Sequence, residues 1–195
     1  MSTFQRTVIF TAITIIPQPI IIASTNDIIS GTDSLTGKAR GMTERHSLEL
    51  KPIGIIHSPY KNTKNVPRHG HESEDISQVE LFQEFEEGLQ DIEEFSHIVV
   101  IFWFHKYQGY QLVVKTPWDD SPHGLFTTRS PQRPSPLGLT VVELVAREKN
   151  MLTVKGLDAV DGTPLLDIKP YIPAIDERRP VKLGWLEGKL PKKRG

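Results

Sequence analysis

Runs of apolar residues between positions 52 and 157 predict most of the elements of this chain. The most apolar run, residues 96–105 (SHIVVIFWFH), is rich in β-branched and aromatic residues and too short to span a membrane, so it predicts a central buried strand. Further strands are predicted at residues 52–57, 124–128, 139–147 and 151–157. The polar segment Glu148-Lys149-Asn150 is expected to join the last two strands as a hairpin.

One amphipathic helix is predicted between the first strand and the central one. Ser77 and Glu80 have the spacing of a capping box at a helix N-terminus. Apolar residues then recur at nearly helical spacing, at Val79, Phe82, Phe85, Leu89 and Ile92. Because strands outnumber helices and do not alternate with them, the sequence predicts a mainly β fold, a small antiparallel barrel or curled sheet with one flanking helix.

Residues 1–41 differ from the rest of the chain and are interpreted as an N-terminal extension. They are rich in isoleucine, and Pro17 and Pro19 interrupt their apolar run, which makes a signal peptide the less favoured interpretation. We favour a disordered tail or an extended start, with the barrel domain covering residues 42–195. Nothing in that domain requires export, so a cytoplasmic location is expected.

Composition removes several classes of chemistry. The 23 Lys and Arg nearly balance the 24 Asp and Glu, so no overall positive field attracts nucleic acid, and such a partner would need a local basic patch. The absence of cysteine excludes disulfides, thiolate catalysis and cysteine-ligated metals. The chain also lacks the Rossmann and P-loop glycine motifs and the HExxH zinc motif.

Two stretches contain most of the candidate chemistry. Residues 127–138 (TTRSPQRPSPLG) combine two arginines with three prolines, which favours a stiff binding loop as much as a surface loop with solvated arginines. Residues 157–171 (LDAVDGTPLLDIKPY) place three aspartates, a lysine and a tyrosine among apolar residues. The segment DGTP alone is an ordinary turn, but titratable groups beside buried surface can have shifted proton affinities.

Basic residues and histidines offer two further candidate sites. Residues 178–195 hold seven Lys and Arg, which we interpret as a solvated end that also offers a phosphate-binding patch. A metal site formed by His69, His71 and His105 is disfavoured because no pair has helical ligand spacing, so no metal is expected.

The stretches above form part of an ordered set of motifs. The set comprises residues 53–60 (IGIIHSPY), 67–69 (PRH), 95–105, 124–138 and 161–171 (DGTPLLDIKPY). In this order and at these separations the motifs resemble the TsaA-like family, whose characterised members are tRNA methyltransferases. The resemblance covers residues 50–175.

The resemblance implies a β-barrel, usually a homodimer, that binds S-adenosylmethionine without a Rossmann fold. Family members methylate N6 of N6-threonylcarbamoyladenosine at tRNA position 37, next to the anticodon. By match to the family motifs, the cofactor is expected to contact His69, Gly70, Phe104, His105, Arg129, Leu139, Asp161, Gly162, Thr163 and Pro164.

The chain departs from the family pattern in three places. His69 replaces the usual glutamine and Ser135 the usual asparagine, and both changes fall in the expected cofactor loops. No C-terminal domain like that of longer bacterial members follows the barrel, so we assign tRNA docking to the basic tail as a hypothesis.

Methylation of an acylated N6 requires that its proton be removed, and a nearby carboxylate or phenolate is suited to accept it. Asp167 and Tyr171 are the candidate catalytic residues. Basic side chains are expected to bind the threonyl carboxylate or the tRNA phosphates. Arg68, Arg133 and Lys169 are the substrate-binding candidates, and Arg129 could share this role.

Two other classes of function stay open at this point. The first is an S-adenosylmethionine-binding or RNA-binding module without transferase activity. The second, ranked last, is a metal-dependent barrel enzyme that uses the three histidines named above.

Overall fold

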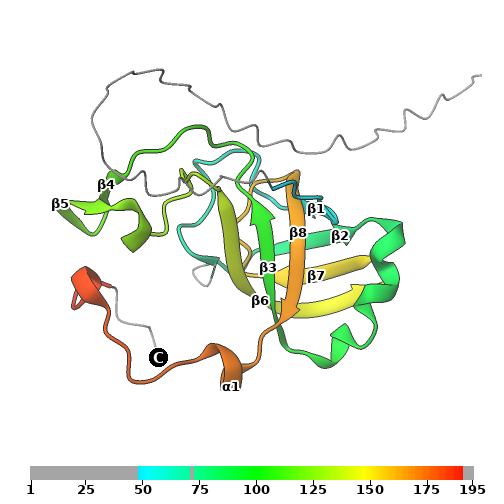
Figure 1. The fold of residues 1–195 in the computed structure, drawn as a ribbon. Coiled ribbons are helices and arrows are strands. Elements are labelled where there is room, and N and C mark those ends of the chain that lie inside the picture. The colour runs from blue at the N-terminus through cyan, green and yellow to red at the C-terminus, as the bar shows by residue number, and fades with distance from the viewer. Residues whose placement is uncertain (1–47, 71–72, 191–195) are drawn as a thin grey trace, which may run out of the picture. The chain divides into compact units, whose positions relative to one another are not determined.

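Six strands close into a barrel in the computed structural model, which describes residues 48–70 and 73–190 (Figure 1). Around the barrel the strands are β1 (Gly54–His57), β2 (Ile76–Leu81), β7 (Met151–Lys155), β6 (Leu137–Glu148), β3 (His97–Trp103) and β8 (Thr163–Pro170). Strand β8 pairs with both β3 and β1, and every pair is antiparallel, so pairing continues round the whole sheet. The predicted mainly β barrel is confirmed.

Four predicted strands are confirmed. The central apolar run forms β3, and the other three form β1, β6 and β7. The hairpin between β6 and β7 is also confirmed, with Lys149 in the left-handed region at φ 55°. Alternation of buried and exposed residues along β6 and β7 gives the barrel one apolar interior and one outward surface.

The predicted amphipathic helix is wrong. Its expected capping box lies in β2, where Ser77 faces the barrel interior and pairs across the sheet with Val154. Only short 3₁₀ segments follow, η2 (Gln83–Leu89) and η3 (Ile92–Glu94). In β2, residues 76–81, the burial pattern has a period of two. Pairing with β1 and β7 satisfies the backbone groups of these residues, and this outweighs the helical spacing of the apolar residues.

The strand predicted at residues 124–128 is also wrong. Strand β5 (Asp119–Gly124) ends there and pairs with β4 (Val113–Thr116) in a hairpin separate from the barrel. A 3₁₀ turn, η4 (Leu125–Thr127), follows. The hydroxyls of Thr127 and Thr128 donate to the carbonyls of Gly124 and Leu125, and these local bonds compete with strand pairing.

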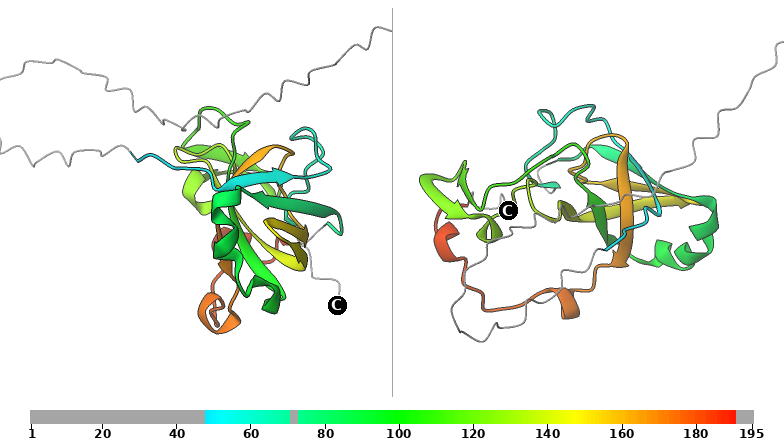
Figure 2. Two further views of the ribbon diagram at one scale, coloured as in Figure 1. Left: turned by 90° about the vertical axis from the view of Figure 1, so that its right-hand side faces the viewer. Right: turned by 45° about the horizontal axis from the view of Figure 1, so that its top comes forward.

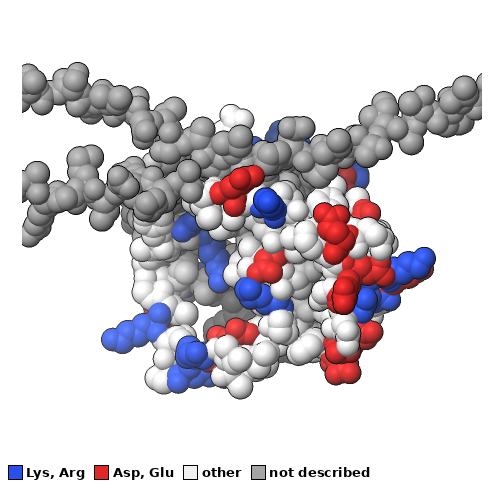
Figure 3. Space-filling model, turned by 45° about the vertical axis from the view of Figure 1, so that its right-hand side comes forward, with Lys and Arg blue, Asp and Glu red and all other residues white. Residues whose placement is uncertain are grey.

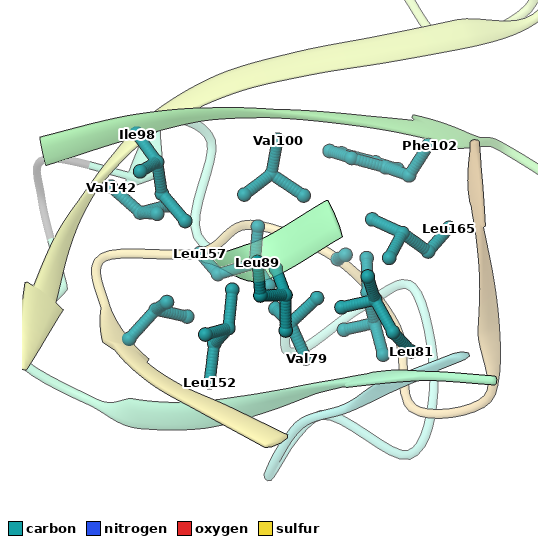
Figure 4. Close-up of a cluster of buried hydrophobic side chains, with 13 residues drawn as sticks. Val79, Leu81, Leu89, Ile98, Val100, Phe102, Val142, Leu152, Leu157 and Leu165 are labelled. Carbon is teal, nitrogen blue, oxygen red and sulfur yellow. The ribbon is translucent and has the colours of Figure 1, made fainter. Parts of the chain in front are cut away.

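The barrel core is built from inward residues of all six strands, and η2 adds Leu89 at one end (Figure 4). Phe102 is 1% exposed and is the largest side chain in this core. Gly138 packs against it, because a Cβ at this position would lie 2.3 Å from the Phe102 ring. The motif glycine at the start of β6 therefore makes room for the aromatic ring of β3.

The C-terminal segment leaves β8 through α1 (Pro173–Asp176) and ends beside the β4–β5 hairpin at η5 (Gly184–Leu186) (Figures 1 and 2). No helix in the described part of the chain is long and apolar enough to cross a membrane. The predicted N-terminal extension, His71 and the last basic residues, Lys192 to Arg194, lie outside the described residues.

Candidate functional site

Part of the predicted cofactor set gathers at one end of the barrel, where β3 ends and β8 begins. His105, just after β3, lies with Nδ1 3.4 Å from Oγ1 of Thr163, the first residue of β8. A cavity of about 30 Å³ opens beside them, and its lining includes Phe104 and Asp158. We call this end the rim, defined by Gly70, Phe104, His105, Asp158 and Thr163.

Asp158 occupies the centre of the rim, although the sequence did not single it out from its neighbouring aspartates. Its carboxylate accepts hydrogen bonds from the Thr140 hydroxyl and the Gly70 backbone N–H. Burial raises the pKa of Asp158, and these hydrogen bonds oppose the rise. The carboxylate therefore joins the loop at Gly70 to the inner face of β6, where Thr140 is buried.

Gly70 is required at the rim because two backbone segments meet there. A Cβ on Gly70 would lie 2.0 Å from the carbonyl oxygen of Gly156, and 2.7 Å from a methyl group of Thr140. Gly156 itself adopts φ +82°, a conformation that other residues rarely adopt. The two glycines thus allow the loop before β2 and the loop after β7 to pack together.

The imidazole of His105 is half-buried between the core and solvent. Burial lowers its pKa, Lys106 lowers it further, and the Trp103 carbonyl opposes both effects. The neighbouring Phe104 ring packs edge-on against Phe102, 5.2 Å between centroids. The rim therefore presents a neutral imidazole beside an aromatic ring, a combination suited to a flat heterocyclic ligand.

The predicted turn at Asp161 and Gly162 is fixed by bonds to the segment after β1. The Asp161 carboxylate accepts from Ser58 N at 3.1 Å and from Lys61 Nζ at 2.9 Å. The Lys61 hydrogen bond is the main reason that the pKa of Asp161 is lowered. Gly162 adopts φ +77°, as the turn requires. Pro164, two residues on, lies in β8 opposite Ile55.

Tyr60 is a buried residue that holds the turn at Asp161 and Gly162 in place. The sequence did not single it out as a site residue. Its side chain is 7% exposed, and its hydroxyl bonds Ser73 at 2.8 Å and Asp75 at 2.9 Å. Burial raises the pKa of Tyr60. Asp161 N also donates to the Tyr60 carbonyl, so the tyrosine connects the loop before β2 to the turn before β8.

The remaining predicted cofactor and substrate residues lie on loops beside the rim. The His69 ring stacks on Trp118 of the β4–β5 hairpin at 6.1 Å between centroids and 10° between planes. Arg68, the residue before it, is exposed and has no hydrogen-bond or ion-pair partner within residues 48–70 and 73–190. Arg68 is therefore available to an anionic ligand.

The two arginines of the proline-rich loop differ in their contacts. Arg133 donates from Nη1 to the Thr128 carbonyl at 3.0 Å and lies 5.5 Å from the centre of the Phe126 ring. Arg129 is exposed and, among the described residues, has no such partner. Arg133 thus shapes the loop that presents Arg129.

Other predicted site residues lie on the outward surface of three adjacent strands. Asp167 of β8 pairs with Ile101 of β3, and Ile101 pairs with Leu139 of β6. The next row along the sheet joins Lys169, Val99 and Val141. We call these six residues, with Leu137 and Trp103, the outer face.

The outer face is apolar at its centre and charged at one edge. Leu137, Leu139 and Val141 are 43%, 54% and 38% exposed. At the β8 edge, Lys169 and Asp167 form an ion pair of 2.7 Å. Exposed apolar side chains in adjacent rows are typical of a surface that another molecule covers.

Tyr171, the second catalytic candidate, lies beyond the last residue of β8, at the opposite end of the barrel from the rim. Its backbone N–H donates to the His97 carbonyl at 3.2 Å, and its hydroxyl lies 3.4 Å from a Glu177 oxygen. Burial and the negative charge of Glu177 raise its pKa. The phenol is therefore neutral at physiological pH, and within one chain it does not meet the rim.

A second cavity, of about 580 Å³, lies at this opposite end between η2, η3 and the last residues of β8. Its lining includes Glu84, Glu87, Phe85 and Phe95, together with Asp167 and Lys169 of the outer face. Figure 3 shows acidic side chains gathered on this side of the molecule. The cavity is larger than the rim cavity, but an acidic lining is unsuited to an RNA backbone.

No three His, Asp or Glu side chains in the described ranges are placed to hold a metal ion. His71, one member of the histidine set considered for a metal, is outside those ranges.

Comparison with known proteins shows which family the chain is similar to. Residues 55–177 match the family model of the tRNA-methyltransferase O N-terminal domain. A probable S-adenosyl-L-methionine-binding protein of Pyrococcus abyssi is 51% identical over 143 residues, which are 73% of this chain and 78% of that protein. The S-adenosyl-L-methionine-binding protein of Archaeoglobus fulgidus is 44% identical over 142 residues, 73% of this chain and 99% of that protein.

Longer relatives are similar over part of their length. The tRNA (adenine(37)-N6)-methyltransferase of Escherichia coli is 37% identical over 138 residues, 65% of this chain and 59% of that enzyme. The crystal structure of TrmO from Pseudomonas aeruginosa superposes with a TM-score of 0.63 at 31% identity, over 77% of this chain and 66% of that one. The resemblance found in the motifs is confirmed, and the chain belongs to the TsaA-like family of tRNA-methyltransferase O N-terminal domains.

Proposed function

We propose that this chain transfers a methyl group from S-adenosylmethionine to tRNA, at N6 of N6-threonylcarbamoyladenosine in position 37. The observation that carries the proposal is the match of residues 55–177 to the family model. The matched residues include the rim, the outer face and residues 128–136, which we call the Arg129 loop. The names of the E. coli and P. abyssi relatives support the reaction and the cofactor. A cytoplasmic location belongs to the proposal because tRNA is the substrate.

The chemistry of the rim suits the cofactor. S-adenosylmethionine brings a reactive methyl group on a sulfonium, so a protein that binds it needs chiefly to hold the reactants and exclude water. Phe104 and the neutral His105 offer surfaces for an adenine ring, and Asp158 offers a carboxylate for a cation or a hydroxyl. Beside the rim, the Arg129 guanidinium, which has no partner among the described residues, is suited to an anionic oxygen of the substrate, a tRNA phosphate or the threonyl carboxylate.

The substrate must lose the N6 proton when the N6–methyl bond forms. A carboxylate can accept that proton, and we keep Asp167 in this role, with Lys169 beside it to hold its orientation. Tyr171 is retained as a contact of the substrate, because its neutral phenol can donate a hydrogen bond. Arg68 and Arg133 complete the set proposed to face the threonyl carboxylate and the RNA phosphates.

We also propose that the active site is shared between two copies of the chain. The rim and the outer face, which carries Asp167, are different surfaces of one barrel, and the outer face is apolar at its centre and exposed. A second copy that covers the outer face would bury these side chains and bring Asp167 against the partner's rim.

The experiment that tests the reaction uses labelled S-adenosylmethionine and tRNA from a strain that lacks only this methylation. We expect label on N6 of threonylcarbamoyladenosine after digestion to nucleosides. Label on another nucleoside would change the substrate. Cofactor binding by calorimetry without any transfer would favour a binding module, the alternative that the names of the two archaeal relatives also support.

A further inference from the structure

The C-terminal segment of the chain is held on the β4–β5 hairpin by a compact set of contacts. The Trp185 ring stacks on His123 with 3.8 Å between centroids and 14° between planes. His123 bonds Asp119 at 2.8 Å, and Lys189 bonds the same carboxylate from the other side. The side chains of His123 and Asp119 are only 13% and 18% exposed, so the stack covers these contacts.

Trp185 also connects the hairpin to the turn that precedes the Arg129 loop. Its indole Nε1 donates to the Thr127 carbonyl at 3.0 Å and lies 3.1 Å from the Thr127 hydroxyl. Thr127 is the last residue of η4, two positions before Arg129. On the other side of this turn, Arg133 donates to the Leu125 and Thr128 carbonyls. The turn is therefore held from both sides, by Arg133 within the loop and by Trp185 from 58 residues away.

The same hairpin reaches the rim through a second tryptophan. Trp118, in the β4–β5 connection, stacks on His69, and His69 precedes the rim residue Gly70. The β4–β5 hairpin thus contacts the C-terminal segment through His123 and the loop that holds Gly70 through Trp118. The right-hand view of Figure 2 shows the hairpin to one side of the barrel, and its two strands form a sheet separate from the barrel sheet.

We propose that residues 184–189 are a latch that positions the Arg129 loop, with Trp185 as the positioning residue. The inference rests on the proposed function, because it assigns Arg129 an anionic oxygen of the substrate, either a tRNA phosphate or the threonyl carboxylate. A latched loop holds the guanidinium in place before the substrate arrives and so lowers the entropy lost on binding. Without the latch, the prolines still stiffen the loop, but its base at Thr127 loses its long-range anchor.

Hydrogen exchange tests the latch without any substrate. Trp185→Ala should speed exchange of the amides of residues 125–130 by about tenfold, since the anchored turn then opens locally. Trp185→Phe keeps the stack on His123 but loses the indole donor, and we expect about a threefold increase. Val181→Ala, an exposed change on the same segment, is the matched control and should leave exchange unchanged. Unchanged exchange in Trp185→Ala would overturn the latch.

Kinetics test what the latch does. Trp185→Ala should raise the KM for tRNA about tenfold, equivalent to about 1.4 kcal/mol, with kcat within about twofold of wild type. A loss of the fold alone would lower the active fraction instead, which a thermal melt detects. In an Arg129→Ala background the tryptophan change should add nothing, because both act through one contact. Additive effects would mean that Trp185 does not act through Arg129.

The two proposals fail in different ways. If the wild-type chain transfers no methyl group, the proposed reaction fails, and the latch is then judged by exchange and by the effect of Trp185→Ala on tRNA binding in a filter assay. If wild type is active but Trp185→Ala changes neither exchange nor KM, the latch alone fails.

Discussion

The rim and the outer face both carry predicted site residues, but they are built in opposite ways. At the rim and the adjoining turn before β8 the carboxylates have partners: Asp158 accepts from Thr140 and Gly70, and Asp161 accepts from Ser58 and Lys61. The outer face instead leaves three apolar side chains of β6 at least 38% exposed. The polar groups of the rim are thus paired within one chain, whereas the outer face leaves apolar side chains uncovered, and we propose that a second copy covers them.

The difference indicates that cofactor binding and proton transfer can belong to separate surfaces, the rim and the outer face. A preorganised rim can bind a cofactor with little rearrangement, but its cavity of about 30 Å³ leaves most of a ligand uncovered. In the proposed dimer, the outer face of a second copy would cover the ligand and supply the carboxylate of Asp167. This division yields predictions that affect one surface and not the other.

The largest effect is expected from Gly70→Val at the rim. The added carbons would collide with the Gly156 backbone, which is 2.0 Å from the Cβ position, so the two loops must separate. We expect a loss of about 3 kcal/mol in the free energy of unfolding and no cofactor binding by calorimetry. Gly124→Ala, where the Cβ meets open space, is the control. Wild-type affinity in Gly70→Val would remove the rim from the cofactor site.

A charge on the outer face should affect assembly while the rim stays intact. Val141→Glu is expected to leave the barrel folded, to yield monomers in sedimentation, and to lower kcat/KM about tenfold or more. Ile76→Glu, an exposed outward position on β2, is the matched control and should have no effect on assembly. A dimer that survives Val141→Glu with full activity would show that the outer face is not the interface.

A smaller effect is expected from Asp158→Ala, which leaves the Thr140 hydroxyl and the Gly70 N–H without their acceptor. We expect a loss of about 2 kcal/mol in urea unfolding. The raised pKa of Asp158 means that the folded state binds the proton more tightly than the unfolded state, so stability falls as the pH rises above the ordinary value of 3.8. Asp158→Asn should remove this dependence, and a curve parallel to wild type would contradict the assignment.

The smallest effect concerns His105. Because burial lowers the pKa of this histidine, the folded state binds fewer protons than the unfolded state, and stability is lost as the pH falls below the ordinary value of 6.5. His105→Gln should flatten the wild-type decline between about pH 6.5 and 5 by less than about 1 kcal/mol. An unchanged slope in thermal melts would mean that His105 is not the group responsible.

The barrel could be predicted from the sequence where the period of the pattern was unambiguous. The run that forms β3 and the β6–β7 hairpin needed only apolar content and a polar turn. The apolar residues from Ser77 to Ile92 have helical spacing, yet the start of this segment is a strand because it pairs with β1 and β7. Which distant strands pair cannot be read from a single sequence.

The site could be predicted in part because its motifs are contiguous. His105 and Thr163, both predicted as cofactor contacts, lie together at the rim, although 58 residues separate them in sequence. Asp158 was missed because spacing alone does not say which of three aspartates turns inward. Trp185 was missed because its partners, His123 and Thr127, come together only through the path of the C-terminal segment.

A mixing experiment tests the central claim, a site made from the rim of one chain and the outer face of another. His105→Ala disables the rim and Asp167→Ala disables the outer face, and each variant alone is expected to be nearly inactive. Coexpression of the two should restore about a quarter of wild-type activity, since half of the dimers are mixed and each mixed dimer has one intact site. Activity no higher than the sum of the two variants would contradict the shared site and confine the chemistry to one chain.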